Sequence, residues 1–439
     1  MEGLIKKPIF SLRRNCLEHL KSAIFSIREK HCHSKSVILV VDEYSVRMIS
    51  LYIKMMELLE CGVSNIEKLE LKRKKFEKMH AIYLISPTES SLDNLICDFS
   101  DKKSPQYKKI HLLLTNILTP NLLEKIAKNQ EIMSRLVSVF EFNQDFFLSD
   151  SNTFHFDCPQ ALSILYSKKN TADKIVIDIS NKLMTVIVNM GCFYEIDIFY
   201  MKPSQSNNFN ESCMNIANKL STNINNLIKN LNKNRDSKLI SKEAGRISLF
   251  LLDRTLDPLT PLLHDFFYQP MLYDLLEIKN GICEYEVEED MKVEKEEEEK
   301  LIKGQKIKKK IVITKKTQLS EEDEVYLRYR YKHIAEVMDG IPSEFKKFVE
   351  TNSNAKMQQG QLGSDMDVEK MSEIIRMMPQ YQQALNKYVL HMKLVEKCYK
   401  IFESRDLKEV GELEQSLATG VDSEGMINFF FFKLSFMKK

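Results

Sequence analysis

Glycine is scarce in this chain. The sequence holds 12 glycines among 439 residues, and none forms the glycine-rich loop that lets a backbone approach a phosphate group. The stretch VVDEYSVRM (residues 40–48), where such a loop would follow the first expected strand, contains no glycine at all. The sequence therefore lacks a dinucleotide-binding fingerprint and a Walker-type loop, and we expect no cofactor.

Paired cysteines and long apolar runs are also missing. Nine cysteines are scattered without a CxxC pair, and no signal-type apolar run stands at the N-terminus, so we expect a reducing cytoplasm. The cluster His31, Cys32 and His33 lacks a second ligand pair at metal spacing, so we expect no metal site. The late apolar run at 426–437 is interrupted by Lys433 and is shorter than the ~20 residues that span a bilayer. Any membrane role should therefore be peripheral.

The chain has almost no net charge. Its 64 basic and 62 acidic residues give +2, so no global field would hold it on nucleic acid or an anionic bilayer. Charged partners must be recognised by local patches. Residues 284–316 carry an acidic run followed by a basic one. This pattern predicts a solvated loop or an exposed two-stranded ribbon whose opposite charges face each other, with nucleic-acid binding as the alternative.

Short apolar runs dominate the first third of the chain. They begin at Val37, Ala81, Ile110 and Val137 and are separated by helix-length segments. Nearly continuous apolar strands alternating with helices are typical of a parallel sheet covered on both faces. The sequence therefore predicts a doubly wound α/β domain.

The rest of the chain reads as a second strand-rich block followed by helices. We expect strands at 174–180, 183–188 and 192–200, the last two in a hairpin-like meander, then a polar helix at 211–232 and a strand at 247–253. Helical apolar spacing begins at Glu321 and runs through Phe348, and it resumes at 368–402 after a link at 351–364. Pro379 lies in the second helical segment and should bend or stop it.

The stretch SLFLLDRTLDPLTPLLHDFFYQPMLYDLL (residues 248–276) holds the best acid/base candidates. Asp253 and Asp257 stand at a strand end and before a proline, where a carboxylate commonly accepts the N–H groups of a turn. His264 and Asp265 are adjacent, and adjacent residues rarely face each other. We interpret these residues as architectural; catalysis is the alternative.

The same stretch resembles the most recognisable segment of the Sec-one/Munc-eighteen (SM) family. The matching residues are Asp253-Arg254, Asp257-Pro258, Pro261, Leu263-His264-Asp265, Tyr268-Gln269 and Tyr273 to Leu276. Further segments that look like the family, in family order, begin at Val40, Ala81, Tyr331, Met378 and Glu414. Pro270 departs from the pattern, and it suits only the first turn of a helix.

The resemblance implies an arch-shaped α/β protein. It would have two doubly wound parallel-sheet domains, at 1–148 and 149–246, the second incomplete. A mainly helical third domain with a β-ribbon would span 247–425, itself truncated, and the tail at 426–439 resembles nothing in the family. We therefore expect the second domain to expose unpaired strand edges and apolar surface.

The resemblance also implies a function. SM proteins are not enzymes; they clasp a syntaxin-type SNARE, contact the vesicle SNARE and the assembled SNARE complex, and regulate vesicle docking and fusion in exocytosis. Such a protein is cytoplasmic and is held at the plasma membrane or vesicles through its SNARE partners, without binding nucleic acid or spanning the membrane. The alternative is an α/β enzyme or nucleotide-binding protein, since a fold alone does not decide function.

Three groups of site residues follow from the resemblance. Asp42, Arg47, Lys54 and Glu67 match positions that contact syntaxin. Leu136, Val139 and Glu141 match a pocket for the N-terminal peptide of syntaxin, although Glu124 stands where an aromatic wall is expected. Pro379 matches a hinge, and Leu385 and Met392 match contacts to the vesicle SNARE.

Overall fold

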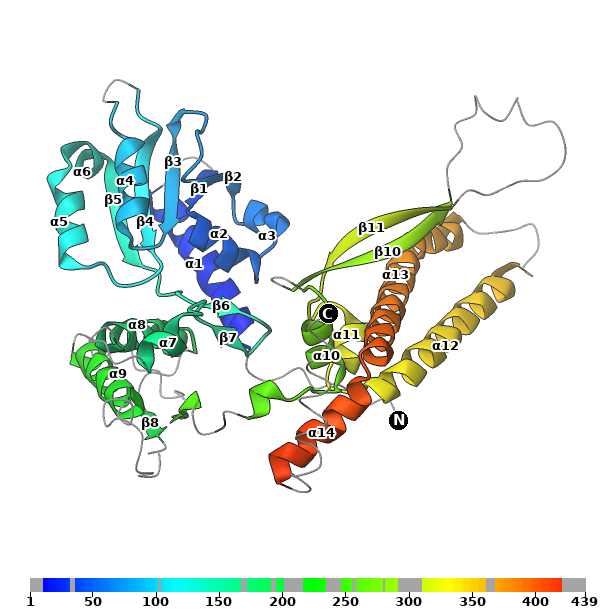
Figure 1. The fold of residues 1–439 in the computed structure, drawn as a ribbon. Coiled ribbons are helices and arrows are strands. Elements are labelled where there is room, and N and C mark those ends of the chain that lie inside the picture. The colour runs from blue at the N-terminus through cyan, green and yellow to red at the C-terminus, as the bar shows by residue number, and fades with distance from the viewer. Residues whose placement is uncertain are drawn as a thin grey trace. The chain divides into compact units, whose positions relative to one another are not determined.

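A computed structural model describes residues 11–31, 36–101, 104–166, 172–190, 195–200, 216–233, 246–254, 257, 259–278, 281–290, 310–360 and 368–420. The chain forms two compact units, Met1–Leu256 and Asp257–Lys439, each of which is visible in Figure 1.

A five-stranded parallel sheet is the centre of the first unit. The strands follow the order β2-β1-β3-β4-β5, and each adjacent pair is parallel. Their bounds are β1 (Val37–Val41), β2 (Val63–Lys68), β3 (Phe76–Ile85), β4 (Tyr107–Leu114) and β5 (Leu136–Glu141). The four predicted strands are confirmed. The sequence does not predict the edge strand β2, because most residues of VSNIEK are polar and three of the six are exposed.

Helices cover both faces of this sheet, as expected of a doubly wound fold. One face packs against α1 (Leu12–His31), α2 (Glu43–Ser50) and α3 (Met55–Glu60). The other face packs against α4 (Glu89–Cys97), α5 (Pro120–Lys128) and α6 (Gln130–Arg135). All five residues of β1 are buried, which explains why its sequence VILVV shows no alternation.

The second block of the first unit corrects one prediction. Residues 174–180 and 183–188, expected as strands, lie in one helix, α8 (Ala172–Met190). Its buried side chains include Val176, Ser180, Leu183 and Ile187, a helical spacing that the many β-branched residues concealed. Strand preference depends on context, and packing decides here in favour of the helix.

The remaining elements of this block agree better with the sequence. β8 (Glu195–Tyr200) lies within the third expected strand, and α9 (Ile216–Lys233) and β9 (Arg246–Leu251) match the expected polar helix and final strand. β8 pairs with β9 in parallel, so the expected hairpin-like meander is wrong. Shorter elements are β6 (Phe147–Leu148), β7 (Phe154–His155) and α7 (Ala161–Leu165).

The two blocks of the first unit share one core. Asn189 of α8 is 6% exposed; its amide nitrogen donates to the Asn143 carbonyl at 2.6 Å, and its amide oxygen accepts from Gln144 at 3.2 Å. Leu183 and Ile187 of α8 join the apolar cluster that includes β1. Hydrogen bonds and apolar packing both cross residue 148, where the sequence predicts a domain boundary. That boundary stays a prediction.

The second unit combines a ribbon with helices. β10 (Ile282–Asp290) pairs antiparallel with β11 (Lys310–Gln318), so the predicted ribbon is confirmed. Lys316 lies opposite Glu284 and its Nζ is 2.6 Å from that carboxylate. The helices are α10 (Tyr268–Leu275), α11 (Glu324–Tyr329), α12 (Ile334–Gly360), α13 (Val368–Ser404) and α14 (Leu407–Thr419), with the short helix η4 at Thr260–Leu262.

The helices α12 and α13 lie side by side (Figure 1). Much of the expected link at 351–364 is helical, because α12 continues to Gly360. α13 runs through Pro379 without interruption, so this proline does not stop the helix, and a bend there stays a prediction. α12 likewise contains Pro342. A proline removes one backbone donor, a cost that packing of the surrounding helix can offset.

Candidate functional site

Asp42 stands at the junction of β1 and α2, where it caps the helix. Its carboxylate accepts hydrogen bonds from the Ser45 N–H at 2.8 Å, from the Ser86 N–H at 2.7 Å and from the Ser91 hydroxyl at 2.8 Å. The residue is 2% exposed. Asp42 thus ties the start of α2 to the end of β3 and to α4, and its negative charge suits the positive end of the α2 dipole.

Arg47 lies on the exposed side of α2. Its guanidinium is 4.9 Å from the centre of the Phe147 ring and donates to the Asp157 carboxylate at 2.9 Å. The side chain remains 45% exposed. The ring and the carboxylate together orient a cation that solvent, or a partner, can still reach.

Lys54 is also exposed and precedes α3. Its backbone N–H donates to the Glu57 carboxylate at 3.0 Å, and Lys21 of α1 holds the same carboxylate at 2.8 Å. The hydrogen bond from Lys21 lowers the pKa of Glu57. These contacts fix the short helix against α1 and hold Lys54 at its start.

Exposed apolar side chains follow Lys54 directly. Met55, Met56 and Leu59 of α3 are 48%, 66% and 43% exposed. Sequence reasoning did not single them out, although two successive methionines after a predicted contact residue are a usable signal, since methionine is common at adaptable binding surfaces. We call the set Arg47, Lys54, Met55, Met56 and Leu59 the α2–α3 surface.

Glu67 occupies β2 and is 8% exposed. It accepts hydrogen bonds from the Tyr107 hydroxyl and, at 3.1 Å, from the Asn65 amide. Burial raises the pKa of Tyr107, so the phenol stays protonated as the donor. The four residues matched to syntaxin contacts thus divide into two that are accessible, Arg47 and Lys54, and two that are built into the fold, Asp42 and Glu67.

The residues matched to the peptide pocket all lie on the edge strand β5. Val139 is 44% exposed, Glu141 is exposed and Leu136 is half-buried. Glu141 lines a cavity of about 170 Å³ that His19 and Ala23 of α1 also line, and neither Leu136 nor Val139 lines it. Glu124 of α5 pairs with Lys128 one turn along its own helix at 2.7 Å.

The predicted vesicle-SNARE contacts lie on α13. Leu385 and Met392 are both half-buried, and Met392 packs against the core of the second unit. Pro379 is part of the same helix. The fully buried His391 anchors α13, because its Nδ1 lies 2.8 Å from the Tyr268 hydroxyl and its Nε2 lies 3.2 Å from the Asp323 carboxylate.

An aromatic seam joins α13 to α12. Phe348 of α12 stacks on Tyr381 with ring centres 5.2 Å apart, and it meets Tyr388 at 5.4 Å. Phe345 contacts Tyr388 from the same helix at 5.8 Å. Such pairs stabilise a helical hairpin beyond the apolar area that they bury.

The acid/base candidates of the 248–276 stretch make hydrogen bonds within the fold. Asp253 accepts from the Tyr166 hydroxyl, and the other three bond nearby backbone groups or α14. Asp257 accepts from the Leu259 and Thr260 N–H groups at 3.2 and 3.0 Å. The Glu414 carboxylate accepts from the His264 N–H at 2.8 Å and lies 2.8 Å from His264 Nδ1. Asp265 accepts from the Phe267 N–H at 2.9 Å. The stretch thereby ties α14 to the start of α10, whose first turn contains Pro270.

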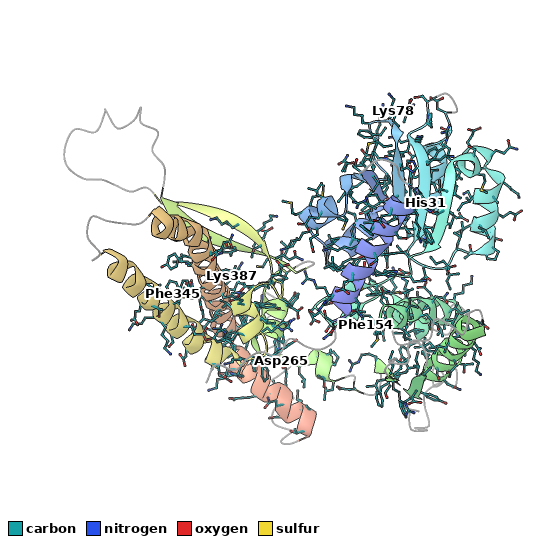
Figure 2. All side chains as sticks on the ribbon, turned by 180° about the vertical axis from the view of Figure 1, so that it is seen from behind. His31, Lys78, Phe154, Asp265, Phe345 and Lys387 are labelled. Carbon is teal, nitrogen blue, oxygen red and sulfur yellow. The ribbon has the colours of Figure 1, made fainter. Side chains whose placement is uncertain are left out.

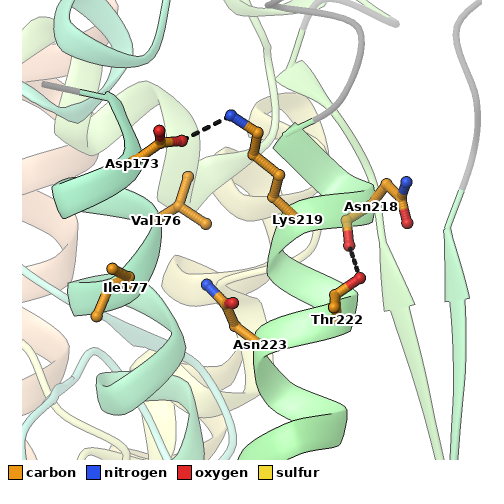
Figure 3. Close-up of a pocket in the computed structure, with 7 residues that line it drawn as sticks. All are labelled: Asp173, Val176, Ile177, Asn218, Lys219, Thr222 and Asn223. Carbon is orange, nitrogen blue, oxygen red and sulfur yellow. Dashed lines mark hydrogen bonds and ion pairs between the residues drawn. The ribbon is translucent and has the colours of Figure 1, made fainter. Parts of the chain in front are cut away.

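A groove lined by both polar and apolar side chains lies between α8 and α9 in the first unit (Figure 3). Its volume is about 280 Å³, and it is closed at one end by an ion pair of 2.6 Å between Asp173 and Lys219. Thr222 in the groove donates to the Asn218 carbonyl of its own helix at 2.9 Å. These lining groups bond within and between the two helices and do not converge as an acid/base set.

Among the described residues, no group of three or more His, Cys, Asp or Glu side chains is placed to hold a metal ion. None of the helices in this described part is long and apolar enough to cross a membrane. Cys32 and His33 lie outside the described residues.

The chain combines a parallel α/β sheet in its first unit with a ribbon and a long helical hairpin in its second. A model of the Sec1 family matches residues 37–429, and the chain belongs to that family. Protein transport protein sec1 of Dictyostelium discoideum is 29% identical over 416 residues, which are 94% of this chain and 63% of that protein.

Other relatives extend the comparison. SNARE-interacting protein KEULE of Arabidopsis thaliana is 26% identical over 386 residues, 87% of this chain and 55% of that protein. The Unc18–syntaxin 1 complex from Monosiga brevicollis matches with a TM-score of 0.69 and 26% identity, over 93% of this chain and 66% of that one. The SM protein Vps45 in complex with the Qa SNARE Tlg2 matches with a TM-score of 0.71 at 19% identity, which shows the fold alone. The chain thus spans less than two thirds of the length of the two curated relatives.

Proposed function

We propose that this protein is a non-catalytic regulator of vesicle docking and fusion that binds a syntaxin-type SNARE. Membership of the Sec1 family supports this proposal, as does the likeness to a structure of an Unc18 protein bound to syntaxin 1. The observation that carries it is the accessibility of Arg47, which the structure holds on Phe147 at the position that the family resemblance assigns to a syntaxin contact.

The α2–α3 surface is the proposed contact. Arg47 is an accessible cation on α2, and the accessible Lys54 directly precedes the exposed Met55 and Met56, so the surface suits a helix with an apolar stripe and acidic residues beside it. In this proposal Asp42 and Glu67 do not contact the partner; they hold neighbouring elements in place. Asp42 fixes α2, which carries Arg47, and Glu67 fixes β2 beside β1.

Arg47→Glu tests the proposed contact. Binding of a cytoplasmic syntaxin fragment, measured by calorimetry, should weaken by about 2 to 4 kcal/mol if the Arg47 charge is desolvated on binding. The matched control is Arg14→Glu, because Arg14 is an exposed arginine on α1 that pairs with Glu18 of its own helix. Equal affinity of wild type and Arg47→Glu would remove this surface from the proposal.

The peptide-pocket assignment is weaker. Of the three, Glu141 lines the cavity beside α1 and Leu136 and Val139 do not, and Glu124 brings a carboxylate where an apolar wall is required. We therefore propose that binding of a syntaxin N-terminal peptide to β5 is weak or absent.

The hairpin of α12 and α13 is the proposed contact for the vesicle SNARE and the assembled SNARE complex. Leu385 and Met392 are half-buried, so a partner helix would gain full access to them only when α13 is repositioned. With these contacts the protein would act in the cytoplasm and reach the plasma membrane or vesicles through its SNARE partners.

Pro379→Ala tests the hinge. A proline in a helix interior costs about 3 kcal/mol relative to alanine, so the substitution should stabilise the N-terminal part of α13 and strengthen binding of a vesicle-SNARE fragment. Pro342→Ala is the matched control, because Pro342 lies inside the neighbouring helix α12. If both substitutions change vesicle-SNARE binding equally, or if Pro379→Ala changes syntaxin binding by the same factor, Pro379 is not a hinge.

A further inference from the structure

Arg47, which belongs to the α2–α3 surface, has a carboxylate partner within its own unit. Its Nη2 donates to one carboxylate oxygen of Asp157 at 2.9 Å. The two residues are 110 positions apart in the sequence, so the fold brings them together. Both side chains remain accessible, Arg47 at 45% and Asp157 at 39%. An acidic group of the protein itself therefore stands where the proposed function places the contact with an acidic partner.

The β6–β7 hairpin fixes the position of Asp157. Phe147 pairs with His155 in this hairpin, and the Asp157 N–H donates to His155 Nδ1 at 3.1 Å. The backbone of Asp157 is left-handed, with a φ of 50°, a conformation that aspartate and asparagine tolerate better than most residues. Phe154 of β7, labelled in Figure 2, marks where the hairpin lies in the first unit. These contacts set the backbone of Asp157 independently of its carboxylate.

The same hairpin holds Arg47. The Phe147 ring stacks on His155 with ring centres 5.6 Å apart, and the Arg47 guanidinium lies 4.9 Å from the centre of the Phe147 ring. Phe147 is 2% exposed, so the ring is a fixed platform. Because the ring orients the guanidinium by itself, the charge of Asp157 is not required to keep Arg47 in place.

A second arginine–aspartate pair of the first unit shows how a structural pair differs. Arg73 and Asp98 are 6% and 12% exposed, and Arg73 Nη2 donates to both oxygens of Asp98 at 2.5 and 2.7 Å. Arg47 reaches a single oxygen of Asp157, and both side chains are in contact with solvent. Exposed ion pairs contribute little to the stability of a fold. The Arg47–Asp157 pair is therefore weak enough to be exchanged for another carboxylate.

A partner carboxylate can offer Arg47 more than Asp157 does. A guanidinium has five N–H donors in a fixed fork, and within the described part of the chain Arg47 uses one nitrogen to bond Asp157. A carboxylate brought into a desolvated interface can accept two parallel N–H groups, which is a stronger contact. The charge of Asp157 opposes the approach of any such carboxylate, because like charges repel.

We propose that Asp157 is a specificity-determining residue of the α2–α3 surface. It occupies Arg47 in the free protein and is exchanged for a carboxylate of the partner on binding. This inference rests on the proposed function, because it takes Arg47 as the syntaxin contact. An acidic protein that offers one weak contact does not displace Asp157, so the exchange raises selectivity. It also makes binding of the true partner weaker than an unpaired Arg47 would allow.

Two substitutions at Asp157 test the exchange. Asp157→Asn removes the charge and keeps an oxygen acceptor, and Asp157→Gly removes the whole side chain; both new residues suit a left-handed backbone. Calorimetry with a cytoplasmic syntaxin fragment should show binding about two- to fivefold tighter for each variant, the range expected of an exposed ion pair. The gain should shrink as salt is raised. In an Arg47→Gln background both gains should vanish, because Asp157 acts through Arg47.

The matched control is Asp93→Asn. Asp93 is an exposed aspartate of α4 that pairs with Lys125 at 2.6 Å, and α4 covers the opposite face of the sheet from α2. This variant changes the net charge equally and should leave syntaxin binding unchanged. A gain as large as that of Asp157→Asn would overturn the proposal. Weaker binding by Asp157→Gly together with unchanged binding by Asp157→Asn would also overturn it, because Asp157 would then only position Arg47.

Chemical modification tests the pair with no partner present. Phenylglyoxal attacks the nitrogens of a guanidinium, and a nitrogen bonded to a carboxylate is less available. Asp157→Asn should therefore speed modification of Arg47 in the full chain, measured by mass spectrometry, and an unchanged rate would overturn the inference. If Arg47→Glu leaves syntaxin binding unchanged, the proposed function fails and this inference with it. If Arg47→Glu weakens binding and Asp157→Asn does not tighten it, only the inference fails.

Discussion

The first unit contains two parallel sheets in very different environments. In the five-stranded sheet, every residue of β1 is 0% exposed, and helices cover both faces. The two-stranded sheet consists of β8 and β9. One of its faces packs against the core of the first unit through the partly buried side chains of Ile196, Ile198, Ile247 and Leu249. The other face carries Phe199 and Phe250, which stack with ring centres 5.0 Å apart and remain 49% and 65% exposed.

This difference indicates that the rigidity of a parallel sheet depends on whether other segments pack on both of its faces. Parallel strands occur almost only with both faces packed, and exposed aromatic side chains on such strands mark a surface that another segment of protein is expected to cover. We therefore expect the first sheet to behave as a rigid scaffold and the second to be sticky in this chain.

The largest expected effect is on the free energy of unfolding. It is measured by replacing isoleucine with alanine in each of the two sheets. Ile82→Ala in β3 removes a side chain that is 0% exposed and should lower the free energy of unfolding by about 2 to 5 kcal/mol. Ile198→Ala in β8 removes a partly buried one and should cost about 1 kcal/mol. Urea unfolding followed by circular dichroism measures both. Equal costs would erase the contrast between the sheets.

A pH effect should be specific to the first sheet. His111 of β4 is 0% exposed, lies against His80 and His31, and its Nδ1 is 2.8 Å from the Ser138 hydroxyl. Burial first, then these two imidazoles, lowers the pKa of His111 to about 4. Between pH 6.5 and 4 the unfolded chain therefore binds a proton that the folded chain does not, and stability falls as pH falls.

The expected loss from this residue is about 2 kcal/mol between pH 7 and pH 5. His111→Gln keeps a hydrogen-bonding side chain without titrating, so urea unfolding of this variant should depend less on pH by that amount. The same pH dependence in wild type and variant would show that His111 is not responsible.

The smallest effect on stability is expected at the open face of the second sheet. Phe250→Ser removes an aromatic side chain that is mostly in solvent, so the free energy of unfolding should change by no more than about 0.5 kcal/mol. Self-association should fall, because the exposed apolar area shrinks. Sedimentation velocity measures the self-association. A wild-type chain that is already monomeric at high concentration would contradict the expectation that the open face promotes self-association.

The sequence predicts the buried strands of the first sheet better than it predicts α8, for a physical reason. The runs at Val37, Ala81 and Ile110 are almost entirely apolar, with His111 as the polar exception, and such runs are typical of a fully buried strand. The sequence of α8 favours strands because KIVIDIS (residues 174–180) is rich in β-branched residues, and its packing against α1 and α9 selects the helix instead. Local sequence does not specify which segments will supply that packing.

The candidate site was predictable in part for a related reason. The family resemblance led to Asp42, Arg47, Lys54 and Glu67, but a sequence motif does not distinguish residues that contact a partner from residues that hold the contact in place. Burial makes that distinction. Asp42 with its serine donors and Glu67 with Tyr107 face inward, whereas Arg47 and Lys54 remain accessible beside methionines that the resemblance did not indicate.

Hydrogen–deuterium exchange with and without a cytoplasmic syntaxin fragment tests the central claim most directly. The rigid first block should gain protection at α2 and α3, around Arg47, Lys54 and Met56, when the fragment is added. β8 and β9 should exchange quickly in both states because one of their faces stays open. Protection that appears only at β8 and β9 or along β5, with α2 and α3 unchanged, would contradict the account.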